Sequence, residues 1–274
     1  MLRAACEVDP LVVWGAFVRL LGVVQLISLL SIRSQLLALA GPRGATPATL
    51  LLARVRADFH GWAARWQRLP TLLWLTGASE AGLMATISLG ILCAVALLLG
   101  WIIPSPVATF VVYACLLSLD EIVDLKFPWD SLLLELSALA ALLPPLEAPV
   151  WQSIRVTTAP HPWVGFVFRF ALFRLLFGFG KLKFVGSTSK DICYIRTFVV
   201  GLPLPTPVGV WLYGALPHAA WGIALAVMFL IEIVAPFFLF CAGWPRVGAA
   251  ASIALLQVGI QLTGNFGHFN LLSQ

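Results

Sequence analysis

The sequence predicts an all-α, multi-pass transmembrane helical bundle with five to seven membrane segments, and three observations support this fold class. Hydrophobic residues make up 61% of the 274 positions and charged residues only 11%, whereas soluble domains typically have about 45–50% and about 25%. Several apolar runs reach the roughly 20 residues that an α-helix needs to cross a bilayer. Eleven tryptophans fit the aromatic belts found at membrane–water interfaces.

Seven apolar segments are the candidate spans, and they lie at residues 11–32, 81–103, 106–122, 131–146, 163–179, 218–240 and 247–262. The first, second, fifth and sixth are long enough to cross about 30 Å of hydrocarbon. The third and fourth are short and bracket an acidic stretch, which favours a broken pair or a re-entrant hairpin. The first run exceeds the roughly 7–15 apolar residues of a signal peptide, so we expect it to be retained. Since no repeat or break in composition occurs, we expect a single helical membrane domain over residues 1–274.

The longest polar connection, residues 34–70, contains an amphipathic pattern around residues 50–68. Its apolar residues recur at spacings of four and three, which places them on one helical face: Leu51, Val55, Phe59, Trp62 and Trp66. Four arginines lie elsewhere on this helix, which is typical of a helix in the headgroup plane of a membrane. A helix packed against the bundle is the alternative. The positive-inside rule would place the connection in the cytosol, but arginines can contact lipid in either leaflet, so the orientation stays open.

A stripe of small residues occurs in the second apolar segment. Gly82, Thr86, Gly90 and Ala94 repeat every four residues and therefore share one helical face. Lipid gives no hydrophobic drive to helix pairing, and small residues let helices approach closely. We expect this stripe to pack within the chain rather than to form a dimer.

Charged residues inside the apolar segments need partners, because a charge deep in a bilayer costs roughly 2.5–3.5 kcal/mol on insertion scales. Acids flank and enter the third and fourth segments, bases lie in the fifth, and one acid lies within the sixth. We expect these charges to form an intramembrane polar network, whose members are Asp130, Glu135, Arg169, Arg174, Lys183 and Glu232. A structural set of ion pairs, a proton relay or transport pathway, and a polar cavity for a lipid or peptide all stay open as interpretations.

Two contacts within this network can be predicted. We expect Glu135 to pair with Arg174, because both lie well inside apolar segments and their charges are opposite. Glu232 precedes Pro236 by four residues, so the proline ring frees the Glu232 carbonyl from its helical hydrogen bond and favours a kink. Two polar groups at one depth need donors, and we expect Glu232 to meet a base of the fifth segment: Arg169, Arg174 or Lys183.

The sequence contains no motif for catalysis, metal binding or nucleic-acid binding. No GxSxG, HExxH, Walker loop or dinucleotide fingerprint occurs, so we expect a protein that is not an enzyme and that uses no cofactor. The five cysteines and four histidines lack metal-ligand spacing. The net charge of +5 includes no basic run interleaved with aromatics outside apolar context, which argues against nucleic acid and favours membrane lipid as a partner.

Five sequence blocks resemble those of the lipase maturation factors and follow the order of that family. The fifth apolar segment carries F-R-L-x-F-G-x-G-x-x-K, in which Gly178 is the first glycine. The other blocks contain Trp129 in W-D-x-L-L-L-E, Pro203 and Pro205 in P-L-P-x-P, Pro236 in E-x-x-x-P, and Gly264, Asn265 and Asn270 in L-T-G-N and F-N-L-L. The resemblance runs from about the first helix to the last residue.

Two departures from the family pattern occur. The family carries Y-E-T-Q just before the proline loop, where this chain has the apolar residues 199–202. Family members also continue beyond the Asn-Leu-Leu block into further membrane sequence and a luminal C-terminal domain. The resemblance therefore predicts a chain without this luminal domain, which would be a truncated member, a gene-model fragment or a divergent paralogue.

The resemblance implies a multi-pass protein of the endoplasmic reticulum membrane that assists the folding and maturation of secreted lipases without catalysing a reaction. Membrane lipid and secreted dimeric lipases are then the expected partners. The alternative is a membrane enzyme or transporter, distantly similar to the vitamin K-dependent carboxylase, that acts on a lipid-like substrate. A structural subunit that stabilises a larger complex is a third class.

Overall fold

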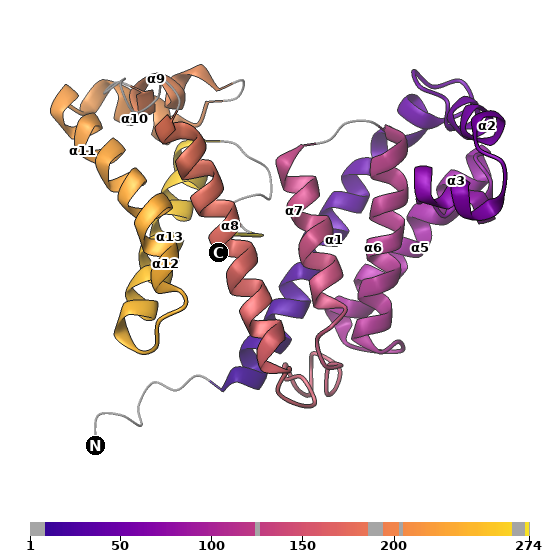
Figure 1. The fold of residues 1–274 in the computed structure, drawn as a ribbon, viewed down its shortest axis with the longest axis horizontal. Helices are drawn as coiled ribbons and strands as arrows, with labels where there is room; N and C mark the ends of the chain where they lie inside the picture. Colours follow the sequence, from indigo (N-terminus) through magenta and orange to yellow (C-terminus); the bar gives the residue numbers. More distant parts are fainter. Residues whose placement is uncertain (1–8, 124–126, 186–193, 203–204, 265–271, 274) are drawn as a thin grey trace. The chain divides into compact units, whose positions relative to one another are not determined.

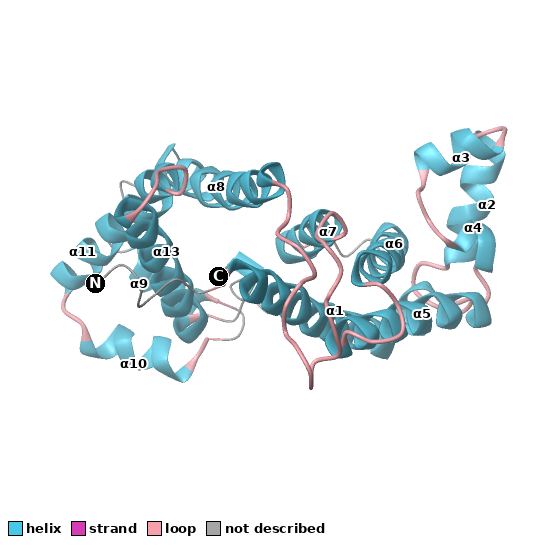
Figure 2. Cartoon of the chain, turned by 90° about the horizontal axis from the view of Figure 1, so that it is seen from below, coloured by secondary structure: helices cyan, strands magenta, loops and turns pink. Residues whose placement is uncertain are grey.

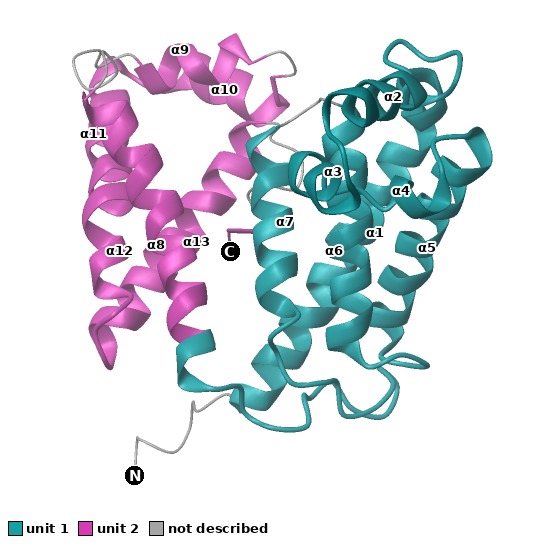
Figure 3. Cartoon of the chain, turned by 45° about the vertical axis from the view of Figure 1, so that its right-hand side comes forward, with its two compact units in different colours: residues 1–164 teal, residues 165–274 magenta. Residues whose placement is uncertain are grey.

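The chain is built from α-helices throughout the part that the structure describes (Figure 1). The structure is a computed structural model that describes residues 9–123, 127–185, 194–202, 205–264 and 272–273. These residues contain no β-strand, and only Leu146 and Val156 form an isolated bridge. The chain divides into two compact units, residues 1–164 and 165–274 (Figure 3). The expectation that all 274 residues form one domain stays a prediction.

Among the described residues, six helices are long and apolar enough to cross a membrane, which confirms the expected five to seven segments. Unit 1 holds α1 (Pro10–Ala40), α5 (Glu80–Leu99) and α6 (Ser105–Val123). Unit 2 holds most of α8 (Pro162–Val185), the segment His218–Phe238, and α13 (Trp244–Thr263). The third predicted segment thus has full span length as α6. The fourth is α7 (Pro128–Ala140), whose 13 residues cover only about 20 Å at 1.5 Å per residue.

Small residues let α1, α5 and α6 approach one another in unit 1. A Cβ atom on Gly90 of α5 would lie 3.1 Å from the Cβ of Cys115 in α6 and 3.2 Å from a methyl group of Leu29 in α1. A Cβ atom on Gly22 of α1 would lie 3.2 Å from the Cβ of Leu97 in α5. The stripe in α5 therefore packs within the chain, as the sequence predicts.

Two hydrogen bonds tie shorter elements to the three spans of unit 1. The Gln25 side-chain amide, which is fully buried on α1, donates to the Ser137 hydroxyl of α7 at 2.8 Å. The backbone N–H of Leu72, just before α4 (Leu73–Thr76), donates to the Ser118 hydroxyl of α6 at 2.8 Å. Buried polar groups are costly unless they are bonded, so each bond also fixes where its element packs.

A buried arginine holds the long connection between α7 and α8. Arg19, on α1, is 5% exposed and donates from Nη2 to the carbonyls of Ala148 at 2.9 Å and Ser153 at 2.7 Å. The N–H of Val150 donates to the carbonyl of Leu99 at the end of α5. Arg155 forms an ion pair with Asp9, the N-cap of α1. These contacts fasten residues 141–161 to the ends of α1 and α5.

Residues 50–68 form two short helices, which corrects the prediction of one amphipathic helix. α2 (Ala48–Asp58) ends before Phe59, and α3 (Trp62–Arg68) begins after Gly61. Gly61 has a φ of 94°, a conformation that glycine adopts readily and that interrupts a right-handed helix. One face of α2 is buried, through Ala48, Leu52 and Val55, whereas α3 has no buried residue. α2 therefore packs against the protein, and α2, α3 and α4 lie together beside α5 (Figure 2).

Unit 2 is a group of spans with two short helices at one end. The second span consists of α11 (His218–Phe229), a π-helical turn η2 (Leu230–Val234) and α12 (Ala235–Phe238). The short helices are α9 (Tyr194–Gly201) and α10 (Pro207–Ala215). The apolar core joins α8 to α13 and includes Leu176, Leu239, Ala249 and Ile253. Phenylalanine rings extend this packing, and the ring centroids of Phe173 and Phe237 are 5.0 Å apart.

We predict that Gly90→Val destabilises unit 1. The added side chain meets Cys115 and Leu29 in tight contact, and overpacking of this kind typically costs about 1–3 kcal/mol. Gly178→Val is the matched control, because a Cβ atom on this mid-span glycine meets no atom within 4 Å. Thermal unfolding of the purified variants in detergent would measure the difference. Equal melting temperatures for the two variants would contradict the packing of α5 described above.

Candidate functional site

A buried ion pair joins the first and second spans of unit 2. The Lys183 ammonium of α8 lies 2.6 Å from Oε1 of Glu232 in η2. Glu232 is only 3% exposed, and the Lys183 side chain is 25% exposed. The predicted contact between Glu232 and a base of the fifth segment is therefore confirmed, and Lys183 is the base that makes it.

Gly180 makes this ion pair possible, because it lets the two spans approach closely. A Cβ atom at Gly180 would lie 2.8 Å from the Cβ of Glu232 and 2.9 Å from Cγ1 of Ile233. Lys183 follows Gly180 by three residues, so its side chain leaves α8 on the same face. Gly178, in contrast, faces open space. Both glycines belong to the family-like block, and the packing role belongs to Gly180 rather than to Gly178.

The carboxylate lies within a π-helical turn. The N–H of Ala235 donates to the carbonyl of Leu230, five residues earlier, and the next residue, Pro236, has no N–H to donate. The expected disturbance of the helix before Pro236 thus takes the form of a π turn. Such turns occur frequently at functional sites.

A thioether and a phenol lie near the ion pair. The Lys183 ammonium is 3.9 Å from the Met228 sulfur. Burial raises the pKa of the Tyr194 phenol on α9, and the nearby Glu232 carboxylate raises this pKa further. Glu232 Oε2 is buried and has no hydrogen-bond partner among the described residues. The arrangement can fix the register of two helices and can accept one more hydrogen bond at Oε2.

The remaining members of the predicted network lie on α7 and α8. Asp130 and Glu135 belong to α7 in unit 1, whereas Arg169 and Arg174 belong to α8 in unit 2. Asp130 Oδ2 accepts the N–H of Phe127 at 3.4 Å. The pairing of Glu135 with Arg174, which lie in different units, stays a prediction. Lys183 and Glu232 are the network members that the structure brings together within unit 2.

A second contact in unit 2 joins the proline loop to the end of α13. The Thr206 hydroxyl, which follows Pro205, donates to the Leu262 carbonyl at 2.7 Å and accepts the N–H of Gly209 at 3.1 Å. A Cβ atom at Gly209 would lie 2.7 Å from the Thr263 carbonyl oxygen. Gly264, directly after α13, is buried. The residues that follow Pro205 therefore pack against the end of α13.

Three of the motif residues lie outside the described residues, namely Pro203, Asn265 and Asn270. Trp129 is described, and its ring stacks on that of Phe127 with centroids 4.6 Å apart. No group of three or more His, Cys, Asp or Glu side chains among the described residues could hold a metal ion. Arg19 is a further buried charge outside the predicted network, and its position inside the first apolar run is the signal in the sequence that points to it.

We predict that Lys183 and Glu232 are energetically coupled. Removing one partner of a buried ion pair typically costs about 3–5 kcal/mol, because the other charge is left uncompensated. Lys183→Met should therefore destabilise the protein, and adding Glu232→Gln should restore most of the loss. A double-mutant cycle on thermal unfolding would measure this coupling. Lys181→Met, an exposed lysine on the same helix, is the control, and strictly additive effects at Lys183 and Glu232 would contradict the coupling.

Asp130 should make the stability of the protein depend on pH. Burial raises the pKa of the Asp130 carboxyl from 3.8 to about 6; the N–H of Phe127 opposes this shift, and Asp120 adds to it. The folded state thus favours the protonated acid. The contribution of Asp130 to the stability of the folded state is therefore complete below the unfolded pKa and is lost as pH rises through about 6.

Asp130→Asn keeps a neutral side chain of the same shape and should remove this dependence. Relative to the variant, the wild-type melting temperature should fall between about pH 4 and pH 7. Asp58→Asn, at an exposed position of α2, provides the control. Parallel pH profiles for wild type and Asp130→Asn would contradict the raised pKa.

The sequence of the chain is similar to that of a known protein family. A sequence model described as the lipase maturation factor transmembrane domain matches residues 13–274. Lipase maturation factor 2 of Homo sapiens is 36% identical over 268 residues, which cover 89% of this chain and 36% of that protein. Lipase maturation factor 1 of Mus musculus is 28% identical over 272 residues, which cover 93% of this chain and 45% of that protein.

No solved structure matches the chain. The chain spans less than half the length of these two relatives, at 36% and 45%. The family match covers both compact units, including α8 with Lys183 and η2 with Glu232. On the basis of this match, the chain belongs to the lipase maturation factor family.

Proposed function

We propose that this chain forms the membrane domain of a factor that helps secreted, dimeric lipases reach their active fold, and that it does so without catalysing a reaction. The observation that carries the proposal is the family match over residues 13–274. Because secreted proteins begin folding in the endoplasmic reticulum, the proposed location is the membrane of that compartment, with multiple spans. Membrane lipid and the folding lipases are the proposed partners.

The geometry of unit 2 supports a scaffold role. Lys183 and Glu232 lie in blocks that resemble the family pattern, 49 residues apart, and they meet as an ion pair. Their charges compensate each other, and Gly180 holds the two spans in close contact. The loop at Thr206 and the end of α13 are also family-like blocks that meet. These blocks therefore support a fixed helical platform, which could hold a folding client and limit aggregation of its exposed apolar surface.

One observation favours a second candidate function, that of a membrane enzyme or transporter. Glu232 Oε2 is buried without a hydrogen-bond partner among the described residues. A membrane enzyme or transporter for a lipid-like substrate could use this oxygen to accept a proton or a hydrogen bond from a substrate hydroxyl group. Glu232→Gln separates the two functions, because it keeps the shape of the side chain while it removes the carboxylate. A scaffold should retain partial activity in this variant, whereas proton chemistry at Glu232 should be abolished.

We predict that deletion of the gene lowers the specific activity of secreted lipases and that reintroduction of the wild-type protein restores it. The Lys183→Met variant should restore less lipase activity than the wild type, since the unpaired Glu232 destabilises unit 2. Lys181→Met, in the exposed position on the same helix, should restore activity as the wild type does.

The measurement is secreted lipase mass together with activity per unit mass, with the level of the membrane protein followed in parallel. A maturation defect lowers activity per unit mass or secreted mass when the factor is depleted. If deletion of the gene changes neither quantity, the proposed function is wrong.

A further inference from the structure

The connection between α1 and α5 carries most of the net charge of the chain. Its residues 41–79 contain five arginines and one aspartate, so they supply four of the five net positive charges. These five side chains form the arginine surface, which consists of Arg43, Arg54, Arg56, Arg65 and Arg68. All of them except Arg65 are exposed. Positive charge is thus concentrated on α2, on α3 and on the residues just before α2.

The arginine surface has no acidic partner within the part of the chain that the structure describes. Arg56 lies over the Trp74 ring, 5.9 Å from its centroid, and Arg65 donates to the Phe59 carbonyl at 3.0 Å. The other three arginines form no hydrogen bond or ion pair with any described residue. The positive charges of this surface are therefore available to an anionic partner.

The arginine surface lies at the end of two spans, at the height of the lipid headgroups. Gly22 of α1 lies against Leu97 of α5, and Leu29 lies against Gly90, so the two spans are antiparallel and the end of α1 is level with the start of α5. α5 has 20 residues, which cover about 30 Å and thus the thickness of a hydrocarbon core. Residues 41–79 therefore begin and end at one surface of that core.

Exposed apolar side chains accompany the arginines at this height. α3 has no buried residue, and its Trp62 is 55% exposed and contacts Trp66 with ring centroids 5.9 Å apart. Leu50 of α2 and Leu75 of α4 are 61% and 68% exposed. Tryptophan is enriched at membrane–water interfaces. Arginines combined with exposed tryptophan and leucine are typical of a surface that lies on a bilayer.

Charge decides which partner fits the arginine surface. Unit 2, residues 165–274, contains seven bases and two acids, so its net charge repels this surface. A second copy of the chain carries the same net charge of +5. An acidic phospholipid supplies a net negative charge at the required height, and its phosphate can accept two parallel hydrogen bonds from one arginine. A zwitterionic lipid has the phosphate but no net charge.

We propose that the arginine surface binds the headgroups of acidic glycerophospholipids, such as phosphatidylserine, in the leaflet at this end of unit 1. The proposal does not depend on a role in lipase maturation. It assigns a headgroup preference to α2 and α3, which goes beyond the general contact of a membrane protein with lipid.

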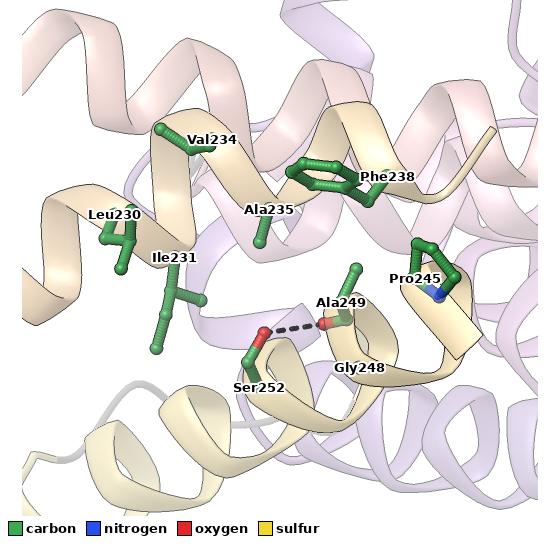
Figure 4. A pocket seen from close by; sticks show the side chains of 9 residues that line it. All are labelled: Leu230, Ile231, Val234, Ala235, Phe238, Pro245, Gly248, Ala249 and Ser252. Atoms are coloured by element: carbon green, nitrogen blue, oxygen red, sulfur yellow. Dashed lines mark hydrogen bonds between the residues drawn. The ribbon is translucent and has the colours of Figure 1, made fainter. Parts of the chain in front are cut away.

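An apolar groove beside α13 provides an uncharged reference within the same chain. Leu230, Val234 and Phe238 of the η2–α12 segment line one wall, and Ser252 of α13 lies on the other (Figure 4). The Ser252 hydroxyl donates to the Ala249 carbonyl at 2.9 Å. Because no charged side chain lines this groove, lipids that differ only in their headgroups should contact it equally.

The test compares two lipid probes in phosphatidylcholine nanodiscs that hold the purified chain. The probes are phosphatidylserine and phosphatidylcholine with the same photoactivatable group high on the acyl chain, each added as a small fraction. Peptide mapping after illumination gives the ratio of serine-probe to choline-probe labelling for each peptide. This ratio should be well above one in residues 43–76 and close to one in the groove peptides. Higher ionic strength should lower the ratio in residues 43–76, because salt screens exposed charges.

Arg54→Gln combined with Arg68→Gln should lower the labelling ratio in residues 43–76. An arginine near an acidic surface contributes up to about fivefold, the equivalent of about 1 kcal/mol. Arg54→Lys combined with Arg68→Lys keeps both charges and should keep most of the ratio. Lys181→Gln combined with Arg246→Gln removes two positive charges from unit 2 and is the matched control, for which wild-type labelling is expected. Surface substitutions of this kind rarely change stability by more than about 0.5 kcal/mol, so all three proteins should fold.

Four outcomes would overturn the proposal. Equal ratios in residues 43–76 and in the groove peptides would mean that this surface has no headgroup preference. A ratio that the glutamine substitutions at Arg54 and Arg68 leave unchanged would place the preference elsewhere. An equal fall of the ratio in the control variant would mean that only the overall charge matters. Cross-links from α3 to a second protein chain in place of lipid would mean that protein covers the arginine surface.

Discussion

Polar groups that enter a hydrocarbon core need partners from the chain itself, because lipid supplies neither hydrogen bonds nor opposite charges. Arg19 donates to carbonyls of the connection between α7 and α8. The Gln25 amide donates to Ser137, and Lys183 pairs with Glu232. Every one of these bonds joins segments that are distant in sequence. The requirement for partners therefore also specifies which helices of each unit pack together.

Small residues bring these partners within reach. Gly180 allows α8 to contact the backbone of η2, so that Lys183 can reach the carboxylate. Gly90 lets α5 contact both α1 and α6, and Gly209 lets α10 approach the end of α13. In a membrane such contacts depend on dispersion forces and on hydrogen bonds, both of which weaken steeply with distance. A side chain at these positions would therefore disturb the polar contacts as well as the packing.

The π turn in unit 2 separates two environments on one span. Glu232 faces Lys183 and the close contact with Gly180, whereas Leu230 and Val234 face the apolar groove beside α13. Two pairs of family-like blocks meet in this unit, at the ion pair and at Thr206. The resemblance to lipase maturation factors thus has a physical counterpart in unit 2, because the residues that carry it form contacts between helices.

The sequence by itself determined the spans and the need for charge partners, because length, apolarity and the presence of a charge are local properties. It did not determine the break between α2 and α3 at Gly61, because the amphipathic pattern continues through this residue although its φ angle is positive. It left three bases as candidates for Glu232, and only the close approach at Gly180 selected Lys183. Lys183 and Glu232 are 49 residues apart, so their pairing depends on the register of the two helices that carry them. That register is set by packing between the helices, which no single segment encodes.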